Sequence, residues 1–263
     1  MRERIRACGI LGVAALVLAC SGCTHVPGVP AESAEVVRPD QQLDFHVLYQ
    51  QNCSGCHGDN GRGGAAIPLN NPAYLAVAGA QNLSTVTAKG MTGTMMPAFA
   101  QSAGGMLTDQ QVDALVQGML REWGRPSDFA STGLPSYSAT TAGNAADGEK
   151  AYANACASCH GTDGTGVKPG TGTSGQQGAT THSIVDPSYL TLVSDQNLRS
   201  YVIAGHLDDN APDWRSYVSG HPLTSQEITD IVAWIASHRT PAEEPSVNSS
   251  RLSPSGVAAK ENR

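Results

Sequence analysis

The chain has 263 residues, of which only 5% are aromatic, and its formal net charge is −7. An acidic chain has no excess of Lys and Arg to neutralise phosphate groups, so the composition excludes a nucleic-acid-binding protein of the basic-patch kind. The length fits one or two domains. Because few aromatic side chains are present to fill a core, the core either relies on aliphatic residues or is completed by an apolar group from outside the chain.

The N-terminus has the layout of an export signal. Three arginines within the first six residues precede an apolar stretch at 10–19, which is too short to cross a bilayer. Residues 1–19 are therefore predicted to be a signal peptide. Cys20 follows in a sequence that resembles a bacterial lipobox and is predicted to be lipidated, with Cys23 as the alternative. A lipid there would hold the protein on a membrane surface without crossing it, with residues 20–40 as a tether.

The remaining chain contains an internal repeat built around a five-residue motif. The motif occurs at 53–57 as Cys-Ser-Gly-Cys-His and at 156–160 as Cys-Ala-Ser-Cys-His. An Asn-Pro pair at 71–72 and an Asp-Pro pair at 186–187 follow in matching order. The second copy carries an insertion rich in Gly, Thr and Ser around 170–178, which predicts a loop. We therefore expect two domains at 41–126 and 146–240, a linker at 127–145 and a disordered tail at 241–263.

Both copies predict the same helices in the same order, and no alternation typical of strands competes with them. A helix leads into each motif, through Leu43, Val47 and Gln50 in the first copy and over 148–157 in the second. The two Asx-Pro pairs suit helix starts, because Asn and Asp cap helices and Pro fits the first turn. Further helical segments are predicted at 83–89 and 198–204.

The last helix of each copy carries the clearest pattern. Thr108 and Thr224 are predicted N-caps, and Thr-Ser-Gln-Glu at 224–227 is a capping-box sequence. Apolar residues then recur every three or four positions, as on an amphipathic helix: Val112, Leu115, Val116 and Met119 in the first copy, and Ile228, Ile231, Val232 and Ile235 in the second. The predicted fold class is all-α, with each copy a small helical domain.

The repeated Cys-x-x-Cys-His motif is typical of c-type haem attachment. On a helical turn, cysteines three residues apart face the same way and can bond to two vinyl groups of one haem. The predicted attachment residues are Cys53 and Cys56 in the first copy and Cys156 and Cys159 in the second. The next residue, His57 or His160, then points its imidazole at the iron. A redox disulfide or half of a zinc site is the alternative for a single Cys-x-x-Cys pair, but two copies in matching contexts favour two haems.

With these motifs the chain resembles tandem class I cytochrome c domains, similar to cytochrome c subunits of respiratory oxidases. In that family a Met from the loop before the last helix is the second iron ligand, and Met-Pro-Ala-Phe at 96–99 matches the ligand motif. The resemblance implies that Met96 ligates the first haem, with Met95 as the alternative. A thioether ligand stabilises ferrous iron and raises the reduction potential. The resemblance also implies that a Pro carbonyl orients the proximal histidine, as Pro68 could for His57.

The second copy departs from this pattern. Ala211 stands where the first copy has Met96, no Met occurs in this domain, and Ser183 replaces Pro68. His206, at the start of the same loop, is the best candidate for the second ligand of this haem. A solvated His206 and an open or water-ligated iron are the alternatives. Two His ligands would lower the potential relative to the first haem, whereas an open site could bind small ligands.

The sequence as a whole predicts an electron-transfer protein with two covalent haems, which is not an enzyme. It would pass single electrons between a donor and an acceptor redox protein, on the periplasmic side of a bacterial membrane or at the cell surface. Two alternatives stay open. The second haem could be an open-site, ligand-binding or peroxidase-like centre, or the chain could be a fixed subunit of a respiratory or dehydrogenase complex.

Overall fold

The computed structural model describes three stretches of the chain, which are residues 37–167, 182–209 and 211–240. The predicted signal peptide lies outside them, and so do the two candidate lipidation sites, Cys20 and Cys23. The Gly-rich insertion of the second copy and the C-terminal tail also lie outside the described residues. Within the described stretches, no helix is long and apolar enough to cross a membrane.

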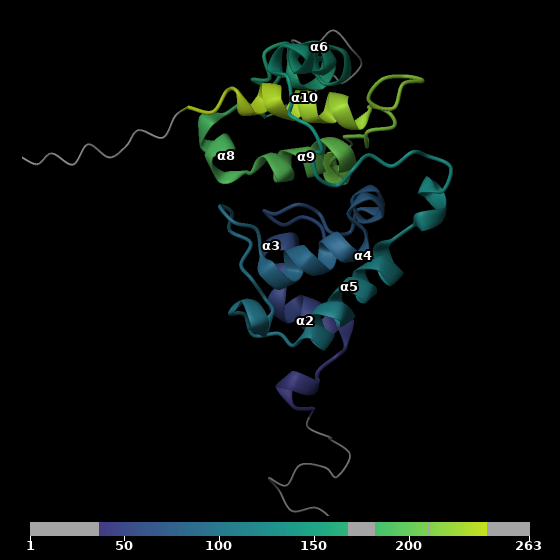
Figure 1. Cartoon of the computed structure of the whole chain (residues 1–263), viewed down its shortest axis with the longest axis vertical. Coiled ribbons are helices and arrows are strands. Elements are labelled where there is room, and N and C mark those ends of the chain that lie inside the picture. Colours follow the sequence, from purple (N-terminus) through teal and green to yellow (C-terminus); the bar gives the residue numbers. More distant parts are fainter. Residues whose placement is uncertain (1–36, 168–181, 210, 241–263) are drawn as a thin grey trace, which may run out of the picture. The chain divides into compact units, whose positions relative to one another are not determined.

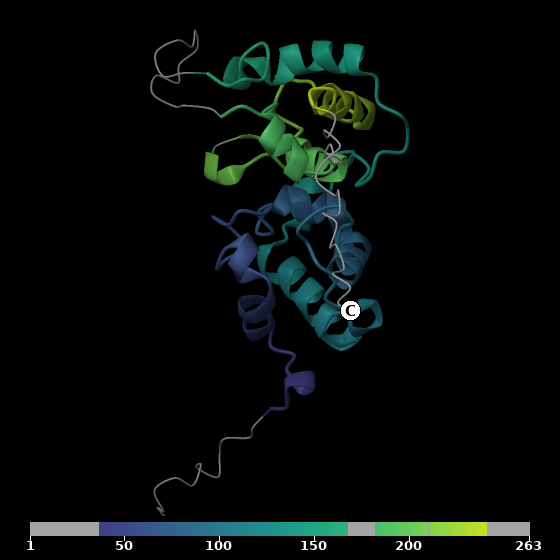
Figure 2. The ribbon, with the colours of Figure 1, turned by 90° about the vertical axis from the view of Figure 1, so that its left-hand side faces the viewer.

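Two units follow one another along the chain, one ending at Gln42 and the other beginning at Leu43. The described part of the first unit contains a short 3-10 helix, η1 (Pro39–Gln41). The second unit contains both copies of the repeat, and Figures 1 and 2 show its helices from two sides.

The first copy is built from helices and loops. Its α-helices are α2 (Phe45–Asn52), α3 (Ser54–His57), α4 (Pro72–Lys89) and α5 (Asp109–Trp123). The 3-10 helices η2 (Gln101–Ala103) and η3 (Pro126–Phe129) follow α4 and α5. Helix α5 packs against both α2 and α4 (Figure 1).

The second copy repeats this arrangement. Its helices are α6 (Ala145–Ala155), α7 (Ala157–His160), α8 (Pro187–Leu192), α9 (Asp195–Ala204), η4 (Leu207–Asp209) and α10 (Ser225–Ala236). Helix α10 packs against α6 and α9, as α5 packs against α2 and α4. Only isolated β-bridges occur among the described residues, so the all-α prediction is confirmed.

The helix starts agree with the predicted caps, except that Leu43 lies before α2, which Asp44 caps. Asn71 caps α4 and Asp186 caps α8, each with Pro at the first helical position. Thr224 forms the predicted capping box at the start of α10, and Thr108 forms one at the start of α5 with Gln111. Each box satisfies backbone N–H groups that have no partner within the helix.

The predicted apolar stripes of the last helices form the two cores. Leu115 and Val116 on α5 are 1% exposed, and Ile228 and Ile231 on α10 are fully buried. An aromatic pair closes each core at equivalent places, with Tyr49 edge-on to Trp123 at 5.1 Å and Tyr152 stacked on Trp234 at 4.0 Å between ring centroids. Aliphatic side chains thus supply most of each core, which is one of the two alternatives that the low aromatic content left open.

Helix α4 joins two segments that the sequence predicts separately. Its backbone leaves the helical conformation at Gly79, where φ is 61° and ψ is 170°. Such a positive φ suits glycine because it has no Cβ. In the second copy the same two segments are separate helices, α8 and α9. The predicted helices at 83–89 and 198–204 therefore lie within α4 and α9.

The predicted linker at 127–145 makes specific contacts with the second copy. Arg199 on α9 is only 2% exposed, and its guanidinium donates to the backbone carbonyls of Ser136 and Tyr137 at 2.9 to 3.1 Å. It also donates to the hydroxyl oxygens of Ser225 and Thr229 on α10 at 2.7 and 2.8 Å. One buried cation therefore joins the linker, α9 and α10.

Replacing Arg199 with Met is expected to lower the free energy of unfolding by about 3 kcal/mol, because several buried oxygens lose their donor at once. The control is Arg121→Met on the exposed face of α5, for which a change within about 0.5 kcal/mol is expected. Denaturation of the two holoproteins by guanidinium measures both values. Equal stability of the two variants would contradict the role given to Arg199.

Candidate haem sites

In both copies the cysteine motif lies on a helical turn. Cys53 ends α2 and starts α3, and its carbonyl accepts from the backbone N–H groups of Cys56 at 3.2 Å and His57 at 3.0 Å. In the second copy the Cys156 carbonyl accepts in the same way, from Cys159 and His160. The two cysteines of each motif are therefore on one side of a turn, as haem attachment requires.

The thiols differ in their exposure to solvent. Burial, and then the neighbouring Cys56, raise the pKa of Cys53 to about 12, while Cys56 itself is exposed. Burial raises the pKa of Cys156 to about 12 as well. A zinc site would need thiolates and four converging ligands. In the described stretches, no group of three or more His, Cys, Asp and Glu side chains could hold a metal ion.

The first proximal histidine is buried and held by one hydrogen bond. His57 is 6% exposed, and its Nδ1 donates to the carbonyl of Ile67 at 2.8 Å. The acceptor is thus Ile67 rather than Pro68, so that expectation is wrong by one residue. Pro68 follows and fixes the backbone of the segment that presents the carbonyl. With Nδ1 used in this way, Nε2 is the nitrogen available to a metal.

The second proximal histidine lacks this anchor. Nδ1 of His160 is buried but forms no hydrogen bond within the described residues. Burial lowers the pKa of His160, and the backbone of His182 acts in the opposite direction. Because His182 precedes Ser183, it occupies the place that Ile67 has before Pro68. A half-buried imidazole whose Nδ1 lacks the short hydrogen bond of His57 fits an iron ligand that is less firmly oriented than His57.

The loop before the last helix returns to the end of α4 in the first copy. Gly90 ends α4 with φ at 68°, and the N–H of Met91 donates to the carbonyl of Met96 at 3.1 Å. A Cβ on Gly90 would lie 2.6 Å from that carbonyl oxygen, so the approach depends on glycine. Met96 is half-buried, whereas Met95 is 88% exposed. The two sequence candidates therefore differ in their surroundings.

The equivalent loop of the second copy brings His206 beside Ala211. Gly205 ends α9 with φ at 66°, and His206 and Ala211 exchange two backbone hydrogen bonds of 3.1 and 3.0 Å. Side chains of residues paired in this way lie on the same face. The His206 ring also stacks on Tyr201, with 6.1 Å between centroids and 22° between planes. The structure therefore places His206 next to the residue that replaces Met96.

The remaining histidines of the second copy lie on its surface. His221 is exposed, and its Nε2 lies 2.9 Å from the carboxylate of Glu227. His182 and His238 are also exposed, and Nδ1 of His238, just beyond the end of α10, donates to the carbonyl of Trp234 on that helix. These positions are less suited to ligate a buried group than His206.

Two tyrosines support the motifs, a role that was not predicted for them. The hydroxyl of Tyr49 donates to the carbonyl of Gly58 at 2.8 Å, and that of Tyr152 donates to Gly161 at 2.7 Å. Each bond ties the helix before the motif to the glycine just after the histidine. Their equivalent positions in the repeat were a signal that could have identified them.

Comparisons with protein families match both copies. The family described as cytochrome c oxidase, cbb3-type, subunit III, matches residues 41–117, and the family described as cytochrome c matches residues 145–239. Each matched range contains one of the two cysteine motifs.

Two curated relatives are similar over about half of the chain, and both are named Cbb3-type cytochrome c oxidase subunit CcoP. The protein from Azospirillum sp. (strain B510) is 24% identical over 160 residues, which are 54% of this chain and 49% of the relative. The protein from Cereibacter sphaeroides is 28% identical over 131 residues, which are 46% of this chain and 40% of the relative. The matches thus span less than half of either relative's length.

Among solved structures, a chain of the reducing HAO-like protein complex of Kuenenia stuttgartiensis gives a TM-score of 0.41 at 16% identity. The alignment covers 74% of this chain and 96% of that chain. A score of this size does not establish a common fold, so the assignment of the two domains depends on the family matches.

Replacing Gly90 with Ala tests the tight return of the loop, and Gly93→Ala is its matched control. Both glycines have positive φ, but a Cβ on Gly93 would meet nothing within 4 Å. Gly93→Ala is therefore expected to cost about 1 kcal/mol of stability through backbone strain alone. Gly90→Ala is expected to cost about 3 kcal/mol, because a backbone clash adds to the strain. Chemical denaturation measures both costs, and equal costs would contradict a specific close approach at Gly90.

Proposed function

The chain is a c-type cytochrome with two cytochrome c domains in tandem, and we propose that it carries two covalent haems and passes single electrons between redox partners in the bacterial cell envelope. The observation that carries the proposal is the repeated turn. In each domain two cysteines lie on one side of a helical turn, directly before a histidine withdrawn from solvent. A haem attached there also supplies the external apolar group that a chain poor in aromatic residues lacks.

Different residues of the first domain would attach the haem and ligate its iron. Cys53 and Cys56 would form the thioether links, and His57 would ligate the iron through Nε2 while Nδ1 stays bonded to Ile67. We propose Met96 as the opposite ligand, because it is half-buried whereas Met95 is exposed. The haem supplies the one-electron change, and the soft thioether of Met96 would favour its ferrous form.

We propose His206 as the second ligand in the other domain, opposite His160. The paired backbones of His206 and Ala211 put their two side chains on one face. Ala211 stands where the first copy has Met96, which supports this choice. Stacking on Tyr201 restricts the ring orientation. An imidazole in place of a thioether would lower the potential of this haem below that of the first. The two haems would then differ in potential, which gives electron exchange between them a preferred direction.

The redox partners are proposed from the named relatives and from charge. Both relatives are named as subunits of a cbb3-type cytochrome c oxidase, which supports a respiratory complex as partner and also the alternative of a fixed subunit. The acidic chain favours a neutral or basic partner surface. We propose that export and a lipid on Cys20, or alternatively Cys23, hold the protein on the periplasmic side of a membrane.

Protein matured in a host that attaches c-type haem is expected to gain the mass of two haems. Combining Cys53→Ala with Cys56→Ala should remove one haem, and combining Cys156→Ala with Cys159→Ala should remove the other, because each motif holds its own group. Cys23→Ala is the control and should keep both. Intact-protein mass spectrometry makes the count, and a wild-type mass without two haems would refute the proposed function.

Replacing His206 with Ala is expected to convert the second haem to a high-spin form that binds carbon monoxide when reduced. The first haem should keep its low-spin signal, because its ligands lie in the other domain. Electron paramagnetic resonance of the oxidised protein and absorption spectra with carbon monoxide make these measurements. The control is His221→Ala, near the far end of the same loop. Carbon monoxide binding by the wild type would instead support the open-site alternative.

A further inference from the structure

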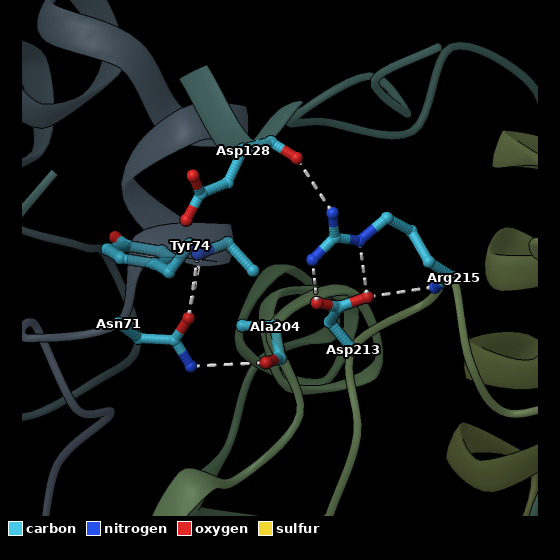
Figure 3. A network of polar contacts seen from close by, with 7 residues as sticks. Asn71, Tyr74, Asp128, Ala204, Asp213 and Arg215 are labelled. Carbon is cyan, nitrogen blue, oxygen red and sulfur yellow. Dashed lines mark hydrogen bonds and ion pairs between the residues drawn. The ribbon is translucent and has the colours of Figure 1, made fainter. Parts of the chain in front are cut away.

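Asn71 is a buried side chain that contacts both domains. It is 1% exposed, and its Oδ1 accepts from the backbone N–H groups of Ala73 and Tyr74 at 3.0 and 3.1 Å. Its Nδ2 donates to the carbonyl of Ala204, the last residue of α9 in the second domain, at 3.1 Å (Figure 3). The amide oxygen thus caps a helix of the first domain, while the amide nitrogen donates a hydrogen bond to the second domain.

The equivalent residue of the second domain shows that capping alone does not need an amide. Asp186 caps α8 through bonds of 2.8 and 3.0 Å to the N–H groups of Ser188 and Tyr189. Asp186 is exposed, and its carboxylate has no N–H to donate. Asn and Asp are comparable as N-caps. The amide nitrogen of Asn71 therefore serves the contact with Ala204.

Each partner of the contact lies within a few residues of a group assigned to one of the candidate haem sites. Asn71 comes four residues after Ile67, whose carbonyl orients His57. Ala204 comes two residues before His206, in the loop that carries Ala211. The amide thus connects two segments. One is the segment that anchors His57, here called the proximal segment, and the other is the loop that carries the proposed ligand His206, here called the distal loop.

The surrounding contacts make this junction a packed interface. Ala204 is part of the core of the first domain, and Ala73 is part of the core of the second. Arg215 pairs with Asp213 through two bonds of 3.0 and 2.8 Å and donates to the carbonyl of Asp128 at 2.9 Å (Figure 3). Its guanidinium lies 4.3 Å above the ring of Phe129, a favourable cation–π contact. Removal of one hydrogen bond would therefore leave the domains in contact.

We propose that the amide of Asn71 is a positioning group for electron exchange between the two haems, because it fixes the distal loop of one against the proximal segment of the other. The inference rests on the proposed function. The exchange moves one electron from the ferrous iron of one haem to the ferric iron of the other, and no bond is made or broken. Its rate depends on a fixed separation and orientation, which Asn71 maintains.

The test compares Asn71→Ser with Asp186→Ser in the full-length holoprotein. Serine is as good a cap as Asn or Asp, so both variants keep a capping oxygen, and only Asn71→Ser loses the bond to Ala204. Partial reduction by a fast pulse, followed by absorption, measures the intramolecular rate. Asn71→Ser is expected to slow the exchange about tenfold, as loss of an outer contact to a ligand-bearing segment does, whereas Asp186→Ser should not change it.

A second readout does not depend on redox activity. The amide protons of Gly205 and His206 bond to Tyr201 and Ala211, and their hydrogen exchange reports on the distal loop. Asn71→Ser should accelerate this exchange, and the electron paramagnetic resonance signal of the second haem should broaden. Asp186→Ser should change neither.

The outcomes separate this inference from the proposed function. Two bound haems with unchanged rate and unchanged loop exchange in Asn71→Ser would overturn the inference alone. A wild-type chain without two haems would overturn the proposed function, and the inference with it. If Asn71→Ser does not fold, the inference is tested on the wild type, by measuring how the rate of electron exchange depends on solvent viscosity. A rate independent of solvent viscosity supports a fixed junction, and a rate that falls in proportion to viscosity overturns it.

Discussion

Each cysteine motif must form a helical turn directly after the helix that leads into it, and the rest of each domain is built around that constraint. Backbone bonds to the Cys53 and Cys156 carbonyls hold the turn, and the helix before each motif is fixed by a long last helix packed across it. A turn that opened by one residue would separate the cysteines and redirect the histidine. The tyrosine bonds to Gly58 and Gly161 close the same turn from the other side.

Local signals allowed the helical framework to be predicted from sequence. The Asx-Pro pairs, the threonine caps and the apolar stripes all depend on residues within a few positions of one another, where short-range sterics and hydrogen bonding decide the outcome. The repeat added a second, independent instance of each signal. The motif itself names the attachment chemistry because few other sites need two cysteines and a histidine at that spacing.

The features that sequence could not supply depend on distant segments. The acceptor for His57 proved to be Ile67 rather than Pro68, since a proline next to the site does not reveal which carbonyl faces the imidazole. The bond from Asn71 to Ala204 joins segments with no local relation, and a capping Asn looks the same with or without it. Likewise, the sequence motif favoured Met96 over Met95, but a physical reason for the choice came only from their different exposure to solvent.

The segment between the two domains determines how far the second domain can move relative to the first. A flexible spacer would set the effective concentration of one haem near the other by its length and stiffness. Here Ser136 and Tyr137 are bound by Arg199, and Phe129 is stacked on Trp214 within the second core. The connecting chain is therefore packed against the second domain and is not a flexible linker. Any reach toward a distant partner must come from the protein moving as a whole.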